Sequence, residues 1–367
     1  MMEQTGLTAQ KSEKTRPILE IDEKTRAELT ALFRGEEWNG EKLPPVYLKY
    51  FSASHETAED AKDMEREMKE ADIFMPEIYG WDSEILAKLR MVSDGKENIP
   101  GKNTTDFSKI LRGYFFDTKK QIVIIDVPEE EVLDHPDIYP EYEFDTEEMM
   151  RSSYEQAAEL LFQDTVLNAE IDLFHRESHM AAHFAEKIKE AVSMNPDLRK
   201  KTSIKVLMIL GVYHSAIYHE MKKLGGNHVS RNFSRDLSFG YAGEIARRFA
   251  FGKETSKEMK EEALCELLFE NGLYYYLEDV CQNTTKNLLF SRYLASLFSL
   301  DEKRALFEQW KTYHKDFEDI VLSVLRRKNI VLPQNEEEMD VMLAKTSYGK
   351  YQKILKEKKQ HHESEQK

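Results

Sequence analysis

The sequence contains very little cysteine. Cys265 and Cys281 are the only two among 367 residues, which is too few for a disulfide scaffold or for a metal site built from thiolates. Free cysteine is among the most buried residue types, so both are predicted to be buried thiols in helices. The fold is therefore expected to rest on packing rather than on disulfide bonds.

Long apolar runs are also missing. No stretch approaches the roughly 18 consecutive apolar residues that a membrane span requires. The N-terminal segment Met1–Lys14 is polar and lacks the apolar core of a secretory signal. These two absences predict a cytoplasmic protein with no membrane partner.

Positive charge is in deficit. The chain has 52 Lys and Arg against 68 Asp and Glu, a formal net charge of -16 that is spread along the sequence. This balance argues against polyanionic partners such as nucleic acid or anionic membrane surfaces. With 41% hydrophobic residues, the chain is nevertheless able to bury a sizeable core.

Four short segments end just before a residue that binds metals or transfers protons. The clearest is Val206–Leu210, an unbroken apolar run that Gly211 closes and that a predicted helix over Ser215–Leu224 follows. This is the pattern of a strand covered on both faces, and it places His214 on a strand-to-helix turn. The other three segments are Val46–Ser52 before His55, Asp72–Met75 before Glu77, and Gln121–Ile125 before Asp126.

Strands that alternate with helices predict an α/β fold with a mixed or mostly parallel central sheet flanked by helices. In open sheets of this class, ligands bind outside the carboxyl ends of the strands. We therefore expect His55, Glu77, Asp126 and His214 to meet at one edge of the sheet.

Composition and periodicity divide the chain into four parts. We predict an N-terminal tail and short helix over 1–40, an α/β core over 41–234 with a helical insertion at about 141–200, a helical C-terminal extension over 235–330, and a polar tail over 331–367. The expected elements include a long helical stretch over Asp145–Ala191, a short final strand over His228–Phe233, and C-terminal helices over Ile245–Phe251, Met259–Phe269, Leu273–Val280, Leu288–Phe298 and Lys303–Val324.

Three histidines are spaced four residues apart in the long helical stretch. His175, His179 and His183 share one helix face, which allows a metal site. The order His-Arg-Glu-Ser-His differs, however, from the zinc-protease motif and from its inverse, and Glu177 points away from the histidine face. We favour a polar helix face that packs beside the sheet.

Two motifs resemble a known family. Ser52-Ala53-Ser54-His55 and Gly211-Val212-Tyr213-His214, with Glu77 between them, resemble the TIKI/TraB superfamily, whose pattern is two Gly-x-x-His motifs and a glutamate. Arg176-Glu177 and Met180-Ala181 are similar to the family's Arg-acid-x-x-Met-Ala helix. The resemblance covers roughly residues 46–225, and related folds occur in erythromycin esterases and ChaN-like proteins. The first motif has Ser52 where the family has Gly.

The resemblance implies a site formed by His55, Glu77 and His214, with Arg176 as a nearby positive group. Two imidazoles and a carboxylate are typical of catalytic zinc sites with an open position, and they also suit manganese or cobalt. A bound cation lowers the pKa of water toward neutrality. Arg176 is then available to stabilise an oxyanion. Asp126 is either a fourth ligand, a group that orients a histidine, or a helix cap before Pro128.

The main functional hypothesis is a metal-dependent hydrolase that acts on a peptide or small ester. One alternative is a metal-free esterase in which His55 is the general base and Glu77 orients it. Another is a catalytically inactive ligand-binding protein, which the serine at position 52 favours. A third is an interaction protein that works through its C-terminal helices. The sequence leaves the substrate, the metal and the oligomeric state open.

Overall fold

The computed structural model describes residues 19, 21–52, 64, 66–85, 87, 121–139, 146–211, 214–233, 240–281, 284–313 and 317–346. His55, and with it the whole Ala53-Ser54-His55 part of the first motif, lies outside these residues.

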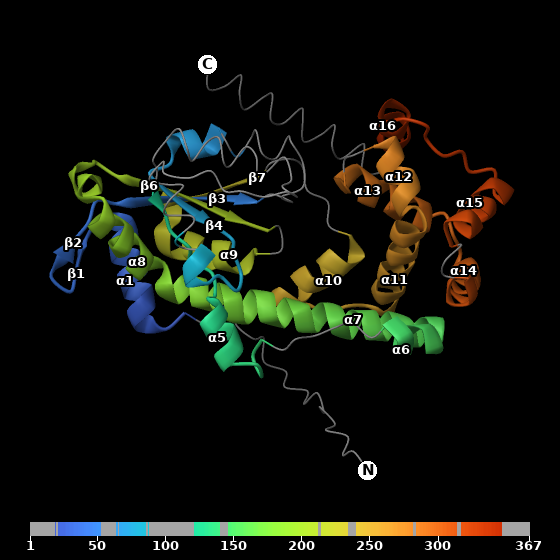
Figure 1. Cartoon of the computed structure of the whole chain (residues 1–367), viewed down its shortest axis with the longest axis horizontal. Coiled ribbons are helices and arrows are strands. Elements are labelled where there is room, and N and C mark those ends of the chain that lie inside the picture. The colour runs from blue at the N-terminus through green and yellow to red at the C-terminus, as the bar shows by residue number, and fades with distance from the viewer. Residues whose placement is uncertain are drawn as a thin grey trace, which may run out of the picture.

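A parallel sheet forms the centre of the N-terminal half (Figure 1). Among the described residues it has five strands, in the order β5-β4-β6-β3-β7. These are β3 (Val46–Ser52), β4 (Ile73–Pro76), β5 (Gln121–Ile122), β6 (Ile204–Leu210) and β7 (Val229–Phe233), and every pairing is parallel. The predicted α/β class with a parallel central sheet is confirmed.

Strand β6 lies between β4 and β3, with Phe74 opposite Leu207 and Leu48 opposite Val206. From Val206 to Leu210 its side chains are apolar in succession rather than in alternation, as in strands that are covered on both faces. Strand β5 is shorter than the predicted Gln121–Ile125, although the Val123 N–H still donates to the Phe74 carbonyl at 3.0 Å.

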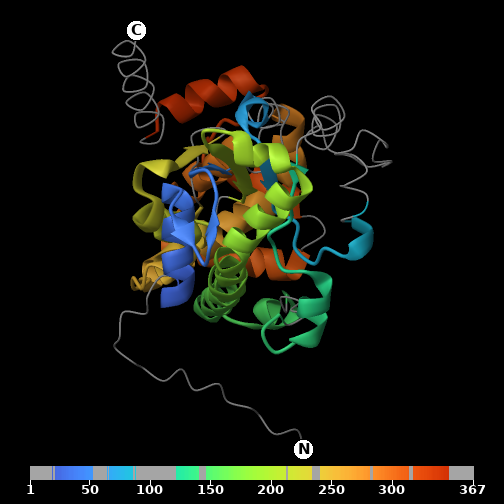
Figure 2. The same ribbon diagram turned by 90° about the vertical axis from the view of Figure 1, so that its left-hand side faces the viewer.

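Three helices cover one face of the sheet: α1 (Glu23–Arg34), α8 (Glu177–Met194) and α9 (Ala216–Gly225), which lie below it in Figure 1. Figure 2 shows the molecule from the left-hand side of Figure 1. Phe33 and Phe184 from these helices pack with Tyr50 and Met208 of the sheet. The opposite face buries Phe51, Phe74 and Leu207 under Met64 and Met68.

Helix α1 begins at a well-formed cap, where the Asp22 side chain accepts from the Thr25 N–H at 2.9 Å. It ends at Gly35, whose φ of 65° is accessible to glycine at little cost. Its residues Leu29, Leu32 and Phe33 are part of the sheet core. The segment predicted as a tail with a short helix therefore contributes to the α/β body.

One long helical rod joins the two halves of the molecule. It consists of α7 (Tyr154–Glu170), a π-helical turn η1 (Ile171–Arg176) and α8, and it follows the short helix α6 (Thr146–Arg151). Ser153 starts α7 with a capping box closed by Gln156. In a π-turn the backbone bonds span five residues instead of four, which changes the helical phase, and such turns are frequent at functional sites.

The C-terminal half is helical. It comprises α10 (Tyr241–Ala250), α11 (Lys257–Gly272), α12 (Tyr274–Val280), α13 (Thr284–Ala295), α14 (Leu300–Tyr313), α15 (Phe317–Arg327) and α16 (Glu336–Ala344). Phe269, Phe290 and Phe307 lie in its core, to which α7 also contributes. The single helix predicted over Lys303–Val324 is two helices, α14 and α15.

Helix α16 falls in the range predicted as a polar tail. Its Met339 and Leu343 are buried against the helical core, so the packed region extends to at least Ala344. Cys265 and Cys281 are both buried free thiols, as predicted, but only Cys265 lies in a helix (α11), because α12 ends at Val280. No helix in the described part of the chain is long and apolar enough to cross a membrane.

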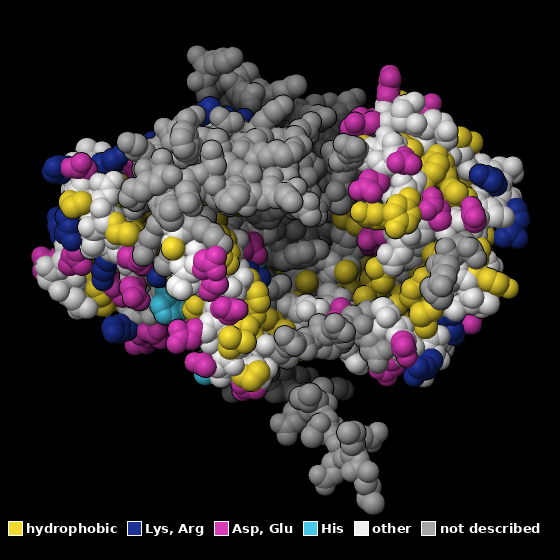
Figure 3. Space-filling model, viewed as in Figure 1, with side chains coloured by type: hydrophobic (Ala, Val, Ile, Leu, Met, Phe, Trp, Pro, Cys, Tyr) yellow, Lys and Arg dark blue, Asp and Glu magenta, His cyan; other side chains and the backbone are white. Residues whose placement is uncertain are grey.

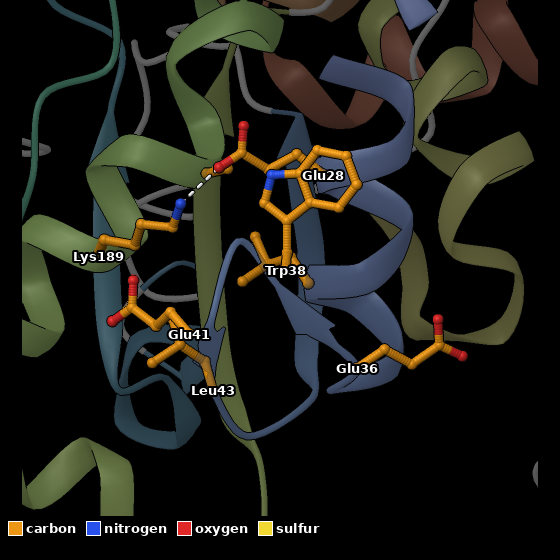
Figure 4. Close-up of a pocket in the computed structure, with 8 residues that line it drawn as sticks. Glu28, Glu36, Trp38, Glu41, Leu43 and Lys189 are labelled. Carbon is orange, nitrogen blue, oxygen red and sulfur yellow. Dashed lines mark hydrogen bonds and ion pairs between the residues drawn. The ribbon is translucent and has the colours of Figure 1, made fainter. Parts of the chain in front are cut away.

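The remaining short elements are the hairpin β1 (Glu37–Trp38) and β2 (Glu41–Lys42), α5 (Glu129–Asp134), η2 (Pro196–Lys200) and η3 (Gly226–His228). Beside the hairpin, a cavity of about 20 Å³ lies next to the Glu28–Lys189 ion pair (Figure 4). The Trp38 Nε1 is buried there without a hydrogen-bond partner among the described residues. A cavity of this size has room for one water molecule.

Charged side chains of both signs are mixed over both halves on the face that Figure 3 shows. This distribution agrees with the even spread of acidic residues along the sequence.

Candidate functional site

The strand order places the switch point of the sheet between β4 and β6, and we call the carboxyl ends of these two strands the crevice. From β4 the chain continues to β5 at one edge of the described sheet, whereas from β6 it continues to β7 at the opposite edge. Connections that leave neighbouring parallel strands in opposite directions open a crevice at their carboxyl ends, where ligands bind in this fold class. Glu77 follows β4 directly and Gly211 follows β6.

Glu77 and His214 meet in this crevice. Glu77 Oε1 lies 3.0 Å from His214 Nε2, and Glu77 Oε2 accepts from the Gly211 N–H at 2.5 Å. The Gly211 carbonyl accepts from the His214 N–H at 3.2 Å, which closes the turn. A Cβ atom at position 211 would lie only 3.3 Å from Glu77 Oε2. Glycine at the end of β6 therefore lets the backbone approach the carboxylate closely.

Arg176 connects Glu77 to Asp126. Its Nε and Nη2 donate to the two carboxylate oxygens of Asp126 at 3.1 and 2.7 Å, and Nη2 also donates to Glu77 Oε1 at 2.9 Å. The Tyr79 ring centroid lies 4.8 Å from the guanidinium carbon. This is the bidentate geometry for which a planar guanidinium is suited.

Asp126 is therefore a partner of Arg176 rather than a helix cap. Its side chain is fully buried, and its Oδ1 also accepts from the Val127 N–H at 2.9 Å. Helix α5 begins after Pro128, which makes no side-chain cap. The capping alternative is wrong, because the carboxylate faces the Arg176 guanidinium instead of the first turn of α5.

Glu177 belongs to the same cluster although the sequence did not suggest it. Its side chain is fully buried, and Oε1 lies 3.3 Å from His214 Nδ1. Its Oε2 accepts from the Ile217 N–H at the start of α9. Because Glu177 points away from the histidine face of the helix, it points toward the sheet and His214. The signal that could have revealed it is its place beside Arg176 in the Arg-acid pair.

The five side chains form one ionic chain, Asp126–Arg176–Glu77–His214–Glu177. Glu77 is the most exposed member, with 20% of its side chain accessible, whereas the other four are at 9% or less. Glu77 is therefore the member of this ionic chain with the most solvent-accessible side chain. On a neighbouring strand, the buried Ser52 accepts from Arg231 Nε at 3.0 Å.

For Glu77 and His214, ionic pairing shifts the pKa more than burial does. Burial acts to raise the pKa of Glu77, but His214, Arg176 and the Gly211 N–H hold that pKa well below its ordinary value. Burial acts to lower the pKa of His214, but Glu177 and Glu77 raise it to about 10. Burial raises the pKa of Glu177, against the effects of His214, Ile217 and Arg231. A raised pKa of this kind predicts that His214 is protonated at neutral pH when no cation is bound.

This pKa predicts a pH dependence of stability for the metal-free protein. A group whose pKa rises from 6.5 to about 10 on folding contributes stability that is complete below pH 6.5 and is lost as the pH rises through about 10. Between these limits, wild type should lose up to about 1.4 kcal/mol per pH unit relative to His214→Gln. Urea unfolding at a series of pH values in the presence of a chelator measures this difference.

The matched control is His135→Gln, because His135 is exposed. Its stability should run parallel to that of wild type at every pH. If the stability of His214→Gln also runs parallel to that of wild type at every pH, Glu77 and Glu177 do not raise the pKa of His214.

The three histidines of the helix face contact residues outside the ionic chain of the site. His179 Nδ1 lies 3.1 Å from Glu131 Oε2, and the His179 and His183 rings are 4.1 Å apart. His175 packs against the ring of Tyr139. These contacts fit the polar helix face that the sequence favoured over a triple-histidine metal site.

Of the predicted site residues, the structure brings together Glu77, His214, Arg176 and Asp126, while His55 lies outside the described residues. Within the described ranges, no group of three or more His, Cys, Asp or Glu side chains is arranged to hold a metal ion. The expected third ligand, His55, is not among the residues searched.

Comparison of the chain with protein-family models, with curated proteins and with solved structures found no match. The TIKI/TraB resemblance therefore stays a prediction that rests on the motifs themselves.

Proposed function

We propose that this chain is a metal-dependent hydrolase that cleaves peptide or ester bonds, as the resemblance to the TIKI/TraB superfamily implies. The observation that carries the proposal is the 3.0 Å contact between Glu77 and His214 at the carboxyl ends of two neighbouring strands. A partly buried carboxylate and imidazole with shifted pKa values at the strand ends are the kind of pair that marks a candidate functional site.

The donor set fits a divalent cation. Glu77 Oε1 and His214 Nε2 are 3.0 Å apart, a separation that two ligands at about 2.1 Å from one ion can adopt. The carboxylate of Glu177 behind Nδ1 is the usual partner of a metal-bound histidine. Glu77, His214 and His55 would hold the ion, which would be zinc, manganese or cobalt. When bound, such an ion acts as a Lewis acid and lowers the pKa of water.

The other residues hold this arrangement in place. Arg176 fixes the Glu77 carboxylate from the side of Asp126, and the Gly211 N–H fixes it from the side of β6. For His214 to act as a ligand through Nε2, the proton on Nε2 must leave while Nδ1 keeps its own. The positive charge of Arg176 next to Glu77 then favours negative charge that develops on a bound carbonyl.

The test begins with metal content. Protein purified without an affinity tag is dialysed against trace zinc, manganese and cobalt, and the bound metal is measured for wild type and His214→Ala. We expect about one metal ion per wild-type chain and its loss in the variant. His135→Ala, at an exposed histidine, is the matched control and should retain the metal.

Ester and peptide panels are then assayed with each metal. Turnover that needs the metal supports the proposal. Turnover with no metal would instead identify the metal-free esterase, and metal binding without turnover would identify a ligand-binding protein. Wild type that neither binds metal nor hydrolyses any substrate contradicts the proposal, and the C-terminal helices then become the region to test for interaction.

A further inference from the structure

The buried carboxylate of Glu177 sits behind His214, on the side away from the crevice opening. The two His214 ring nitrogens face different carboxylates, with Nε2 at 3.0 Å from Glu77 and Nδ1 at 3.3 Å from Glu177. Nδ1 and Glu177 Oε1 are both fully buried, and neither makes a well-aligned hydrogen bond within the described residues. Within the described part of the chain, the ion pair between them is therefore the polar contact that Nδ1 makes on that side of the ring.

We propose that Glu177 is the positioning residue of this site, and that it keeps the proton of His214 on Nδ1 and so turns Nε2 toward Glu77. This inference rests on the proposed function, because it assigns Nε2 as the atom that faces the ligand. Glu177 contacts neither the crevice nor a substrate, since its side chain is fully buried, and it acts through His214.

Two features hold the Glu177 carboxylate itself. Its Oε2 accepts from the backbone N–H of Ile217 at the start of α9, where the helix dipole also favours negative charge. Its backbone follows directly after the π-turn Ile171–Arg176. This turn shifts the phase of the rod, which lets Arg176 reach Glu77 while Glu177 reaches His214.

The substitution Glu177→Gln separates the roles of the two oxygens. An amide has one oxygen and one NH₂ group, so it can accept from only one of its two neighbours. The Ile217 N–H is always a donor, whereas Nδ1 of His214 can donate or accept. The amide oxygen should therefore pair with Ile217, and the NH₂ group should face Nδ1. Because Nδ1 then faces a donor, it should release its proton to solvent, and the ring keeps only the proton on Nε2, the nitrogen that faces Glu77.

Long-range ¹H–¹⁵N spectra of selectively labelled histidines test this directly, with the His214 signals assigned by their absence in His214→Gln. Wild type should carry a proton on Nδ1, and Glu177→Gln should lose it. Glu177→Asp, whose two oxygens both accept, should regain the Nδ1 proton. Near-UV circular dichroism establishes that each variant is folded.

Glu220→Gln is the matched control, because Glu220 is also a buried glutamate but lies within α9 and pairs with Arg26 and Lys223 instead of His214. We expect metal affinity to fall about 10- to 100-fold in Glu177→Gln, with kcat reduced and KM within about twofold, and no change in Glu220→Gln. A folded Glu177→Gln protein whose Nδ1 stays protonated, or whose metal affinity is unchanged, overturns the proposal.

The two proposals fail in different ways. If wild type binds no metal and shows no turnover, the hydrolase proposal fails, yet the ring spectrum still decides whether Glu177 sets the protonated nitrogen of His214. If wild type is active and Glu177→Gln retains both the Nδ1 proton and full activity, Glu177 is only a structural residue.

Discussion

Replacing Arg176 with methionine should lower the free energy of unfolding by about 3–5 kcal/mol. The guanidinium lies between the fully buried carboxylate of Asp126 and that of Glu77, at 2.7 and 2.9 Å. Methionine fills much of the same space but leaves both carboxylates without their cation. Removing one partner of a buried ion pair is costly because the remaining charge is uncompensated. Urea unfolding at neutral pH measures the loss.

The matched control is Arg151→Met, because Arg151 pairs with Glu147 on the surface and both side chains are 77% exposed. This substitution should change stability by less than about 0.5 kcal/mol. Asp126→Asn, alone and combined with Arg176→Met, completes a double-mutant cycle. The double variant should be more stable than the sum of the single losses predicts, by about 0.5–3 kcal/mol. A loss below about 1 kcal/mol for Arg176→Met alone would show that the pair contributes little.

Glu77→Gln should lower kcat/KM by about 10²- to 10⁴-fold on whichever ester or peptide the enzyme cleaves. The amide keeps the size of the side chain but not its charge. In wild type, Oε1 accepts from Arg176 and faces His214, while Oε2 accepts from Gly211. A single amide oxygen cannot serve all three donors, and its NH₂ group would oppose one of them. The ligand that faces the crevice opening is lost as well.

Glu130→Gln on the exposed surface of α5 is the control, and it should keep wild-type kinetics. Initial rates over a range of substrate concentrations separate kcat from KM. If Glu77→Gln stays within about threefold of wild type while His214→Ala is inactive, Glu77 would be a structural partner of Arg176 and His214 alone would carry the chemistry.

The sequence by itself was sufficient to locate the strands of the central sheet and the ends at which the site lies. Val206–Leu210 is apolar at every position and closed by Gly211, and this local pattern is enough to specify a buried strand. Pro76 after Ile73–Met75 limits β4 in the same local way. Because parallel strands share one carboxyl edge, these ends also predicted that Glu77, Asp126 and His214 lie near one another.

Only the tertiary structure decided how these residues pair. Arg176 reaches Asp126 and Glu77 across 50 and 99 residues of sequence, and no local pattern encodes such a contact. The insertion of β6 between β3 and β4 is likewise a property of the packed sheet. Local propensity sets each element, whereas burial of the whole apolar surface sets their order.

The role of Glu177 and the packing of α16 were likewise not predictable from the local sequence. The π-turn before Glu177 has no proline or glycine to announce it, so the sequence predicted one uninterrupted helical stretch. Helix α16 has an acidic first turn and lies in the range predicted as a polar tail, yet its Met339 and Leu343 are buried against the helical core. In both places a few buried contacts, made only once the chain is folded, outweigh the average character of the local sequence.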